Sequence, residues 1–105
     1  MENFKSLVHS HPFVLVDFFA TWCEPCKVLD VILQDVSNHF GNELKIIKID
    51  IEKNEAIAKA YELKSVPILH LYKDGDLIWK YKGFMNTTDT IKTLETYKSL
   101  KKFKT

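Results

Sequence analysis

The first long apolar segment of the chain, with the residues that follow it, is FVLVDFFATWCEPCKVLD, residues 13–30. Residues 13–20 are rich in β-branched and aromatic side chains with almost no polar alternation, which is typical of a strand buried on both faces of a sheet. We therefore expect this strand to be central. From Cys26 to Phe40 apolar residues recur at helical spacing, and Gly41 is a natural stop, which predicts a long amphipathic helix.

Further elements are expected on both sides of this strand and helix. Asp74 and Gly75 between two apolar runs predict an antiparallel hairpin, and the threonines at 87 and 88 can cap a last helix. The resulting order predicts an α/β protein in which helices cover both faces of a central mixed sheet. The expected elements are a helix over 2–9, a strand over 13–20, a helix over 26–40, a strand over 44–51, a helix over 54–61, strands over 67–72 and 77–81, and a helix from 87 onward.

Composition limits the classes of protein that the chain can belong to. Its 105 residues, with 46% hydrophobic and 28% charged side chains, predict a single folded domain over 1–105 that ends in a basic tail over 101–105. The net charge is +1, and all 15 basic residues are lysine, so we expect no nucleic-acid partner. No signal peptide or membrane span is apparent, which favours a cytoplasmic protein without membrane contact.

The two cysteines lie where the apolar strand meets the long helix, in the segment WCEPCK, residues 22–27. A helix N-terminus carries partial positive charge and stabilises a thiolate, so Cys23 is expected to be a nucleophile. Pro25 suits the first helical turn, and Cys26 shares a face with Cys23 at disulfide distance. This pattern predicts a pair that opens and closes as a redox-active disulfide.

Three other uses of the cysteines are weighed against redox cycling. A zinc site would need two further ligands, and there is no second CxxC motif, so no metal is expected. Attachment of haem is excluded because Lys27 stands where the haem motif needs histidine. A purely structural disulfide would close a loop too short to contribute much chain entropy. The four histidines lie in elements that do not obviously converge: His9, His11, His39 and His70.

Residues 16–27 resemble the active-site segment of the thioredoxin family. Further agreement lies in Lys48-Ile49-Asp50, Val66-Pro67, Lys73-Asp74-Gly75 and Gly83, so that the resemblance extends from residue 13 to about residue 100. It implies the thioredoxin fold, with the dithiol at the start of the long helix. It also implies a protein-disulfide reductase that acts by dithiol/disulfide exchange, in which Cys23 attacks the substrate disulfide and Cys26 resolves the mixed disulfide.

Two of the departures of the chain from the family pattern bear on the cysteine pair and on the sheet. Glu24 replaces the glycine that usually follows the first cysteine, and its carboxylate should disfavour the Cys23 thiolate and make the pair slightly more reducing. Glu24 and Pro25 are therefore the expected redox-tuning residues. The first helix also begins so early that the family's N-terminal edge strand is expected to be short or missing.

Asp17 is the only charged residue in the apolar strand. Burial raises the pKa of a carboxyl group, so Asp17 could act as a base, although it could equally be a core acid satisfied by hydrogen bonds. The resemblance implies the first role: the matching aspartate assists deprotonation of the second cysteine, and a lysine that matches Lys48 is its charged neighbour.

The resemblance also implies a substrate groove beside the cysteines. It would be lined by Trp22, Val66, Pro67 and Gly83, with the Val66 backbone pairing with an extended substrate segment. The sequence alone does not choose between a cis and a trans Val66–Pro67 bond, whereas the resemblance implies cis.

The implied partners are disulfide-containing client proteins and an NADPH-linked flavoprotein, thioredoxin reductase, with the chain acting as a monomer and binding no cofactor. Two alternatives stay open. A disulfide oxidase or isomerase of the same fold would need an export signal and a more oxidising pair. An adaptor of the same fold would bind a partner protein without redox turnover.

Overall fold

Strand β1, Phe13–Phe19, lies at the centre of the sheet, as its apolar sequence predicts. The fold is taken from a computed structural model that describes residues 2–100. Strand β2, Lys45–Asp50, pairs with β1 in parallel, whereas β3, Ile68–Lys73, pairs with it antiparallel, and β4, Asp76–Lys82, completes the hairpin with β3. The four strands follow the order β2-β1-β3-β4, which confirms the predicted mixed sheet.

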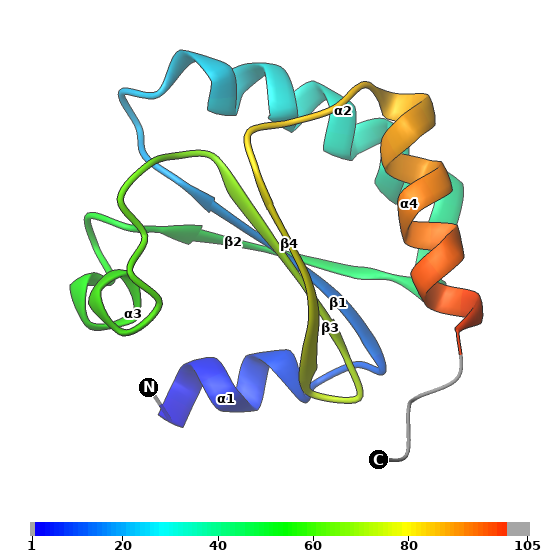
Figure 1. Cartoon of the computed structure of the whole chain (residues 1–105), viewed down its shortest axis with the longest axis horizontal. Helices are drawn as coiled ribbons and strands as arrows, with labels where there is room; N and C mark the ends of the chain where they lie inside the picture. The colour runs from blue at the N-terminus through cyan, green and yellow to red at the C-terminus, as the bar shows by residue number, and fades with distance from the viewer. Residues whose placement is uncertain (1, 101–105) are drawn as a thin grey trace.

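Alternation along β1 creates two hydrophobic cores, one on each face of the sheet. Phe13 and Leu15 pack toward α2, Glu24–Phe40, and α4, Thr87–Ser99. Val14, Val16 and Phe18 lie in the second core with residues of α1, Glu2–Val8, and α3, Glu55–Ala60. Figure 1 shows α2 and α4 above and to the right of the strands, and α1 and α3 below and to the left. Because side chains alternate along a strand, Asp17 falls on the face covered by α2.

Helix α2 starts two residues earlier than its apolar spacing predicts. Glu24 and Pro25 form its first turn, and the Cys23 side chain caps it by accepting a hydrogen bond from the Cys26 N–H. At the other end the Gly41 N–H donates to the Ser37 carbonyl, and Gly41 has a φ of +55°, which confirms the predicted stop. A short 3₁₀ turn over Gly41–Glu43 leads on to β2. The buried side of α2 consists of Cys26, Leu29, Ile32, Leu33, Val36 and Phe40.

The hairpin and the last helix are fixed by specific contacts. Asp74 and Gly75 both have positive φ, as a tight turn requires, and the His9 ring lies where a side chain on Gly75 would stand. The cap of α4 is not a threonine, as the sequence suggested, but Asn86, whose side chain accepts from the Asp89 N–H at 2.8 Å. Asn86 can act as the cap because its backbone is extended, which is the conformation in which a side-chain oxygen reaches the free N–H groups of the first helical turn.

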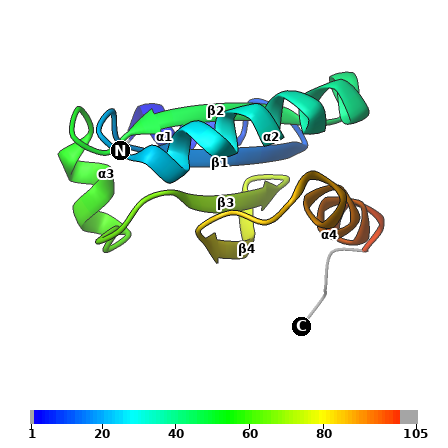
Figure 2. The same ribbon diagram turned by 90° about the horizontal axis from the view of Figure 1, so that it is seen from above.

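Two expectations concern the ends of the chain. Residues 2–12 contain α1 and a turn but no strand, which agrees with the expectation that the N-terminal edge strand is short or missing. Strand β2 is therefore one edge of the described sheet and β4 is the other, as the view from above in Figure 2 shows. The predicted basic tail over 101–105 lies outside the described residues. Within residues 2–100, none of the helices has the length and apolar character needed to span a membrane.

Candidate active site

The cysteine pair occupies the N-terminal turn of α2. Cys23 and Cys26 form a disulfide, with their Cα atoms 5.3 Å apart. The Cys26 backbone N–H points at the Cys23 sulfur, with a nitrogen–sulfur distance of 3.2 Å. This N–H is one of the unpaired donors that give a helix N-terminus its partial positive charge. When the disulfide is reduced, the same donor and the same charge would favour a thiolate on Cys23 over a neutral thiol.

Apolar residues surround the two cysteines. Only 3% of Cys23 and 4% of Cys26 is exposed, because the pair packs with Ala20 and is bordered by Phe19, Ile51 and Val66. Little of the Cys23 sulfur is therefore open to solvent in the disulfide form. Two of these apolar residues lie at the ends of neighbouring strands. Strand β1 ends at Phe19, and the Ile51 N–H donates to the Phe19 carbonyl, so the end of β2 lies beside the end of β1.

Glu24 is the charged residue that lies between the two cysteines in the sequence. Its carboxylate forms an ion pair with Lys27 at 2.7 Å, and both side chains are exposed. The lysine partly cancels the negative charge that Glu24 adds beside Cys23, and exposure to water weakens what remains. The predicted effect of Glu24 on the cysteine pair is therefore small.

Asp17 is completely buried, and neither of its carboxylate oxygens has a hydrogen-bond partner in the part of the chain that the structure describes. Burial raises the pKa of this carboxyl group from 3.8 to about 7, the positive charge of Lys48 lowers it, and the negative charge of Asp30 raises it. No side chain or backbone donor within residues 2–100 satisfies this carboxyl group. A buried carboxyl group that titrates near neutral pH is instead suited to proton transfer.

Lys48 lies opposite Asp17 in the pairing of β1 with β2, so both side chains leave the same face of the sheet. Its ammonium group, however, bonds to Asp30 on α2 at 2.6 Å and sits 4.7 Å from the centre of the Phe19 ring. Sequence reasoning placed Lys48 beside Asp17 but missed Asp30. The available signal was spacing, because Asp30 follows Cys26 by four residues and so lies one helical turn farther along α2.

The four residues expected to line a groove are positioned by three different loops. The Val66–Pro67 bond is cis, as the resemblance implies, and Val66 borders the cysteine pair. The Gly83 N–H donates to the Pro67 carbonyl at 2.8 Å, which joins the end of β4 to this loop. Trp22 is 65% exposed, and its indole N–H donates to the Glu52 carboxylate at 2.9 Å. Sequence reasoning did not identify Glu52.

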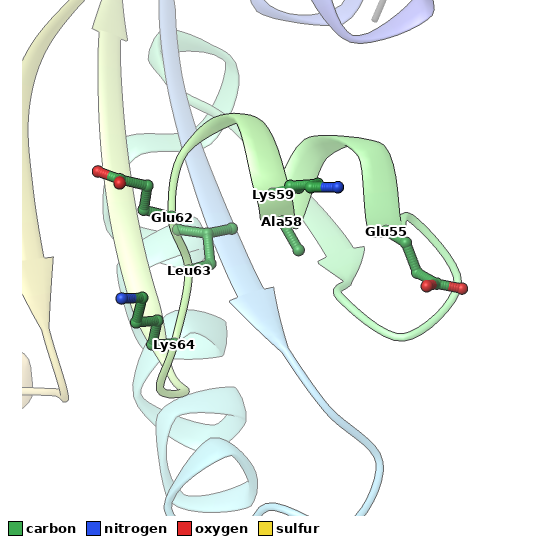
Figure 3. A pocket seen from close by; sticks show the side chains of 6 residues that line it. All are labelled: Glu55, Ala58, Lys59, Glu62, Leu63 and Lys64. Carbon is green, nitrogen blue, oxygen red and sulfur yellow. The ribbon is translucent and has the colours of Figure 1, made fainter.

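A separate cavity of about 490 Å³ lies beside α3 and includes neither cysteine. Figure 3 shows that its walls carry two carboxylates and two ammonium groups, so that their formal charges cancel. Among residues 2–100, no three histidine, cysteine or acidic side chains gather closely enough to hold a metal ion. The residues around this cavity are Glu55, Ala58, Lys59, Glu62, Leu63 and Lys64.

The fold and the site together define a class of protein. A CxxC disulfide at the N-terminus of a helix, with a cis-proline loop beside it and a buried carboxyl group on the sheet face that the helix covers, is the arrangement of a thiol–disulfide oxidoreductase.

Comparison with known proteins gives the family. The thioredoxin family model matches residues 1–96, so the chain belongs to the thioredoxin family. A thioredoxin-like protein of Synechocystis is 36% identical over 90% of this chain and 91% of its own length. The chloroplastic thioredoxin Y of rice, Oryza sativa, is 38% identical over 78% of this chain, which spans about half (49%) of that longer protein.

Solved structures agree with this assignment. A mutant thioredoxin from Halobacterium salinarum superposes with a TM-score of 0.84 at 27% identity, over 97% of this chain and 88% of that one. Family membership and the cysteine pair make this chain a protein-disulfide oxidoreductase that acts by dithiol/disulfide exchange.

Proposed function

We propose that the chain reduces disulfide bonds in client proteins, with Cys23 as the attacking thiolate and Cys26 as the resolving thiol. In the first step a Cys23–client disulfide forms, the client's own disulfide breaks, and its second sulfur leaves and takes up a proton. In the second step Cys26 attacks the Cys23 sulfur and the client's remaining sulfur leaves. Two electrons pass to the client, and the chain keeps the Cys23–Cys26 disulfide. The observation that carries this proposal is the Cys26 N–H aimed at the Cys23 sulfur.

Asp17 is assigned as the base of the second step. Cys26 must lose its proton before it attacks, and Asp17 projects from the face of β1 that α2 covers. With a pKa of about 7, this carboxyl group is partly ionised at neutral pH and can accept a proton from Cys26, directly or through water. Lys48 is assigned as the charged group that favours the ionised form of Asp17.

The client is expected to bind beside the cysteines as an extended segment. Trp22, Val66, Pro67 and Gly83 would form the contact surface, and the Val66 backbone would pair with the client as an added strand. The exposed face of Trp22 supports this assignment, because a large aromatic side chain held in place by Glu52 offers apolar area at little entropic cost.

The chain is expected to work as a monomeric single domain in the cytoplasm. A disulfide reductase needs a compartment in which its dithiol is regenerated, and the cytoplasm maintains reduced thiols. Regeneration is assigned to an NADPH-linked flavoprotein, thioredoxin reductase, so that the chain carries electrons from that enzyme to its clients.

A pair of measurements tests the proposed direction of electron flow. The first is the reduction potential of the Cys23–Cys26 pair, and the second is NADPH-coupled reduction of a model protein disulfide. A potential near −270 mV with catalytic turnover is expected for a reductase, whereas a potential near −120 mV would indicate an oxidase. Loss of all turnover when both cysteines are replaced by serine is expected as well. Biological activity that survived this replacement would identify an adaptor instead.

The role of Asp17 has its own test. In the Asp17→Asn variant, release of a client trapped as a mixed disulfide on Cys23 should slow, and the pH dependence of this step near neutrality should disappear. Resolution kinetics that match the wild type across this pH range would remove Asp17 from the mechanism.

A further inference from the structure

We propose that Asp30 is a positioning residue of this site, whose carboxylate holds the Lys48 ammonium group away from Asp17 and so leaves the buried carboxyl group without a cationic partner. This inference rests on the proposed role of Asp17 as a base. It adds a residue that takes no part in the exchange itself and acts only through Lys48.

Two carboxylates, those of Asp17 and Asp30, come from positions close to Lys48. Its backbone lies directly opposite Asp17, but its ammonium group lies 2.6 Å from the Asp30 oxygen and over the Phe19 ring. Among residues 2–100, neither this ammonium group nor any other donor forms a hydrogen bond with an Asp17 oxygen. The lysine that is best placed to neutralise Asp17 is therefore committed to a different partner.

The position of Asp30 explains why the Lys48 ammonium group pairs with it and not with Asp17. Lys48 and Asp30 are both about half exposed and line a cavity of about 320 Å³ between α2 and β2. An ammonium group at this place keeps part of its hydration, whereas contact with Asp17 would draw it into a fully buried setting. The apolar stem of the lysine can lie along the sheet while its charged end remains at the cavity.

Few other charged groups are placed to act on Asp17. On its β3 side Asp17 pairs with Leu69, and His70 leaves the opposite face of the sheet and packs against Phe18. From α4 this core receives Leu94, with Ile91 and Tyr97 packed against it, and the other buried residue of the helix, Thr90, carries no charge. The titratable or charged groups that β2, α2 and β4 contribute to this face near Asp17 are Lys48, Asp30, Cys26 and Tyr81.

Removal of the Asp30 charge should act on Asp17 in two ways. It releases Lys48 to approach the buried carboxylate, and it removes a negative charge that disfavours ionisation of Asp17. Both effects lower the pH at which Asp17 loses its proton. Only the first effect depends on Lys48, so a second substitution at Lys48 separates them.

The experiment follows the Asp17 carboxyl carbon by NMR during a pH titration of the oxidised protein. Asp30→Asn should lower the midpoint of this titration by about one pH unit relative to the wild type. Asp30→Glu retains a carboxylate and should keep the midpoint close to the wild-type value. The matched control is Asp35→Asn, which removes the same charge from α2 five residues farther along and should leave the midpoint unchanged.

A double-mutant cycle decides whether Lys48 transmits the effect. In a Lys48→Met background, Asp30→Asn should shift the midpoint by less than half of its shift in the wild type. An equal shift in both backgrounds, or a midpoint in Asp30→Asn that matches Asp35→Asn, would overturn the proposal. Because the titration reports on the carboxyl group itself, it keeps its meaning even if Asp17→Asn proves to have no effect on mixed-disulfide resolution.

Discussion

Replacement of Asp17 by asparagine should stabilise the folded protein, and the gain should grow with pH. The folded protein retains the Asp17 proton up to about pH 7, whereas the unfolded chain loses it near its ordinary pKa of 3.8. Between these values the folded state binds more protons than the unfolded state, so its stability falls as the pH rises. Asparagine cannot ionise and removes this loss.

The size of the effect follows from the two pKa values. They differ by about 3 pH units, and each unit corresponds to about 1.4 kcal/mol. The free energy of unfolding of Asp17→Asn relative to the wild type should therefore increase by about 4 kcal/mol between pH 4 and pH 8, and then level off. Any cost of the buried amide itself is the same at every pH and does not alter this difference.

The assay is guanidinium denaturation of both proteins in their oxidised form at intervals between pH 4 and pH 9. His70 also titrates in this range, but both proteins contain it, so that its contribution cancels in the comparison. Stability curves that stay parallel across the whole range would refute the reasoning, because they would mean that Asp17 ionises equally easily in the folded and unfolded chain.

Three further changes test other parts of the structure. Glu24→Gly should raise the reduction potential of the cysteine pair by roughly 10 mV, because it removes a charge that disfavours the Cys23 thiolate; a lower potential would contradict this. Gly75→Ala and Gly41→Ala should each lower the free energy of unfolding by about 1–3 kcal/mol in denaturant titrations, and the loss at Gly75 should be the larger. Both glycines have positive φ, but only at position 75 would a side chain meet the His9 ring, so equal losses would argue against the clash. His70→Leu should gain stability over the wild type as the pH falls from 6.5 to about 4, since burial lowers the pKa of His70 from 6.5 to about 4 and the unfolded chain takes up the proton first; a pH-independent difference in the same titrations would rule this out.

Local sequence signals are enough for most of the fold. The apolar run of β1 has no polar alternation because both of its faces are buried, and Asp74-Gly75 supplies the positive φ values of the hairpin turn. The residues at which the helices begin are harder to predict from the sequence. The start of α2 depends on a hydrogen bond to the Cys23 sulfur, and the start of α4 depends on the Asn86 side chain, neither of which affects the apolar period.

Some residues of the site can likewise be predicted from local sequence, and others cannot. The cysteine pair and Asp17 are visible in the sequence because the motif and the lone charge in an apolar strand are local features. Asp30 and Glu52 acquire their meaning only from partners distant in the chain, Lys48 and Trp22. Such pairs depend on how α2 and the loop after β2 come together over the sheet, which a single sequence does not specify.

The central claim is that the N-terminus of α2 holds the Cys23 sulfur in its ionised form. The most direct measurement is the rate of alkylation of Cys23 in the reduced protein as a function of pH, with Cys26→Ser used to isolate the reacting sulfur. A thiolate that forms at least one pH unit below the point at which an unperturbed cysteine ionises is the expected result. Ionisation at or above that point would contradict the claim, because the helix would then give Cys23 no advantage as a nucleophile.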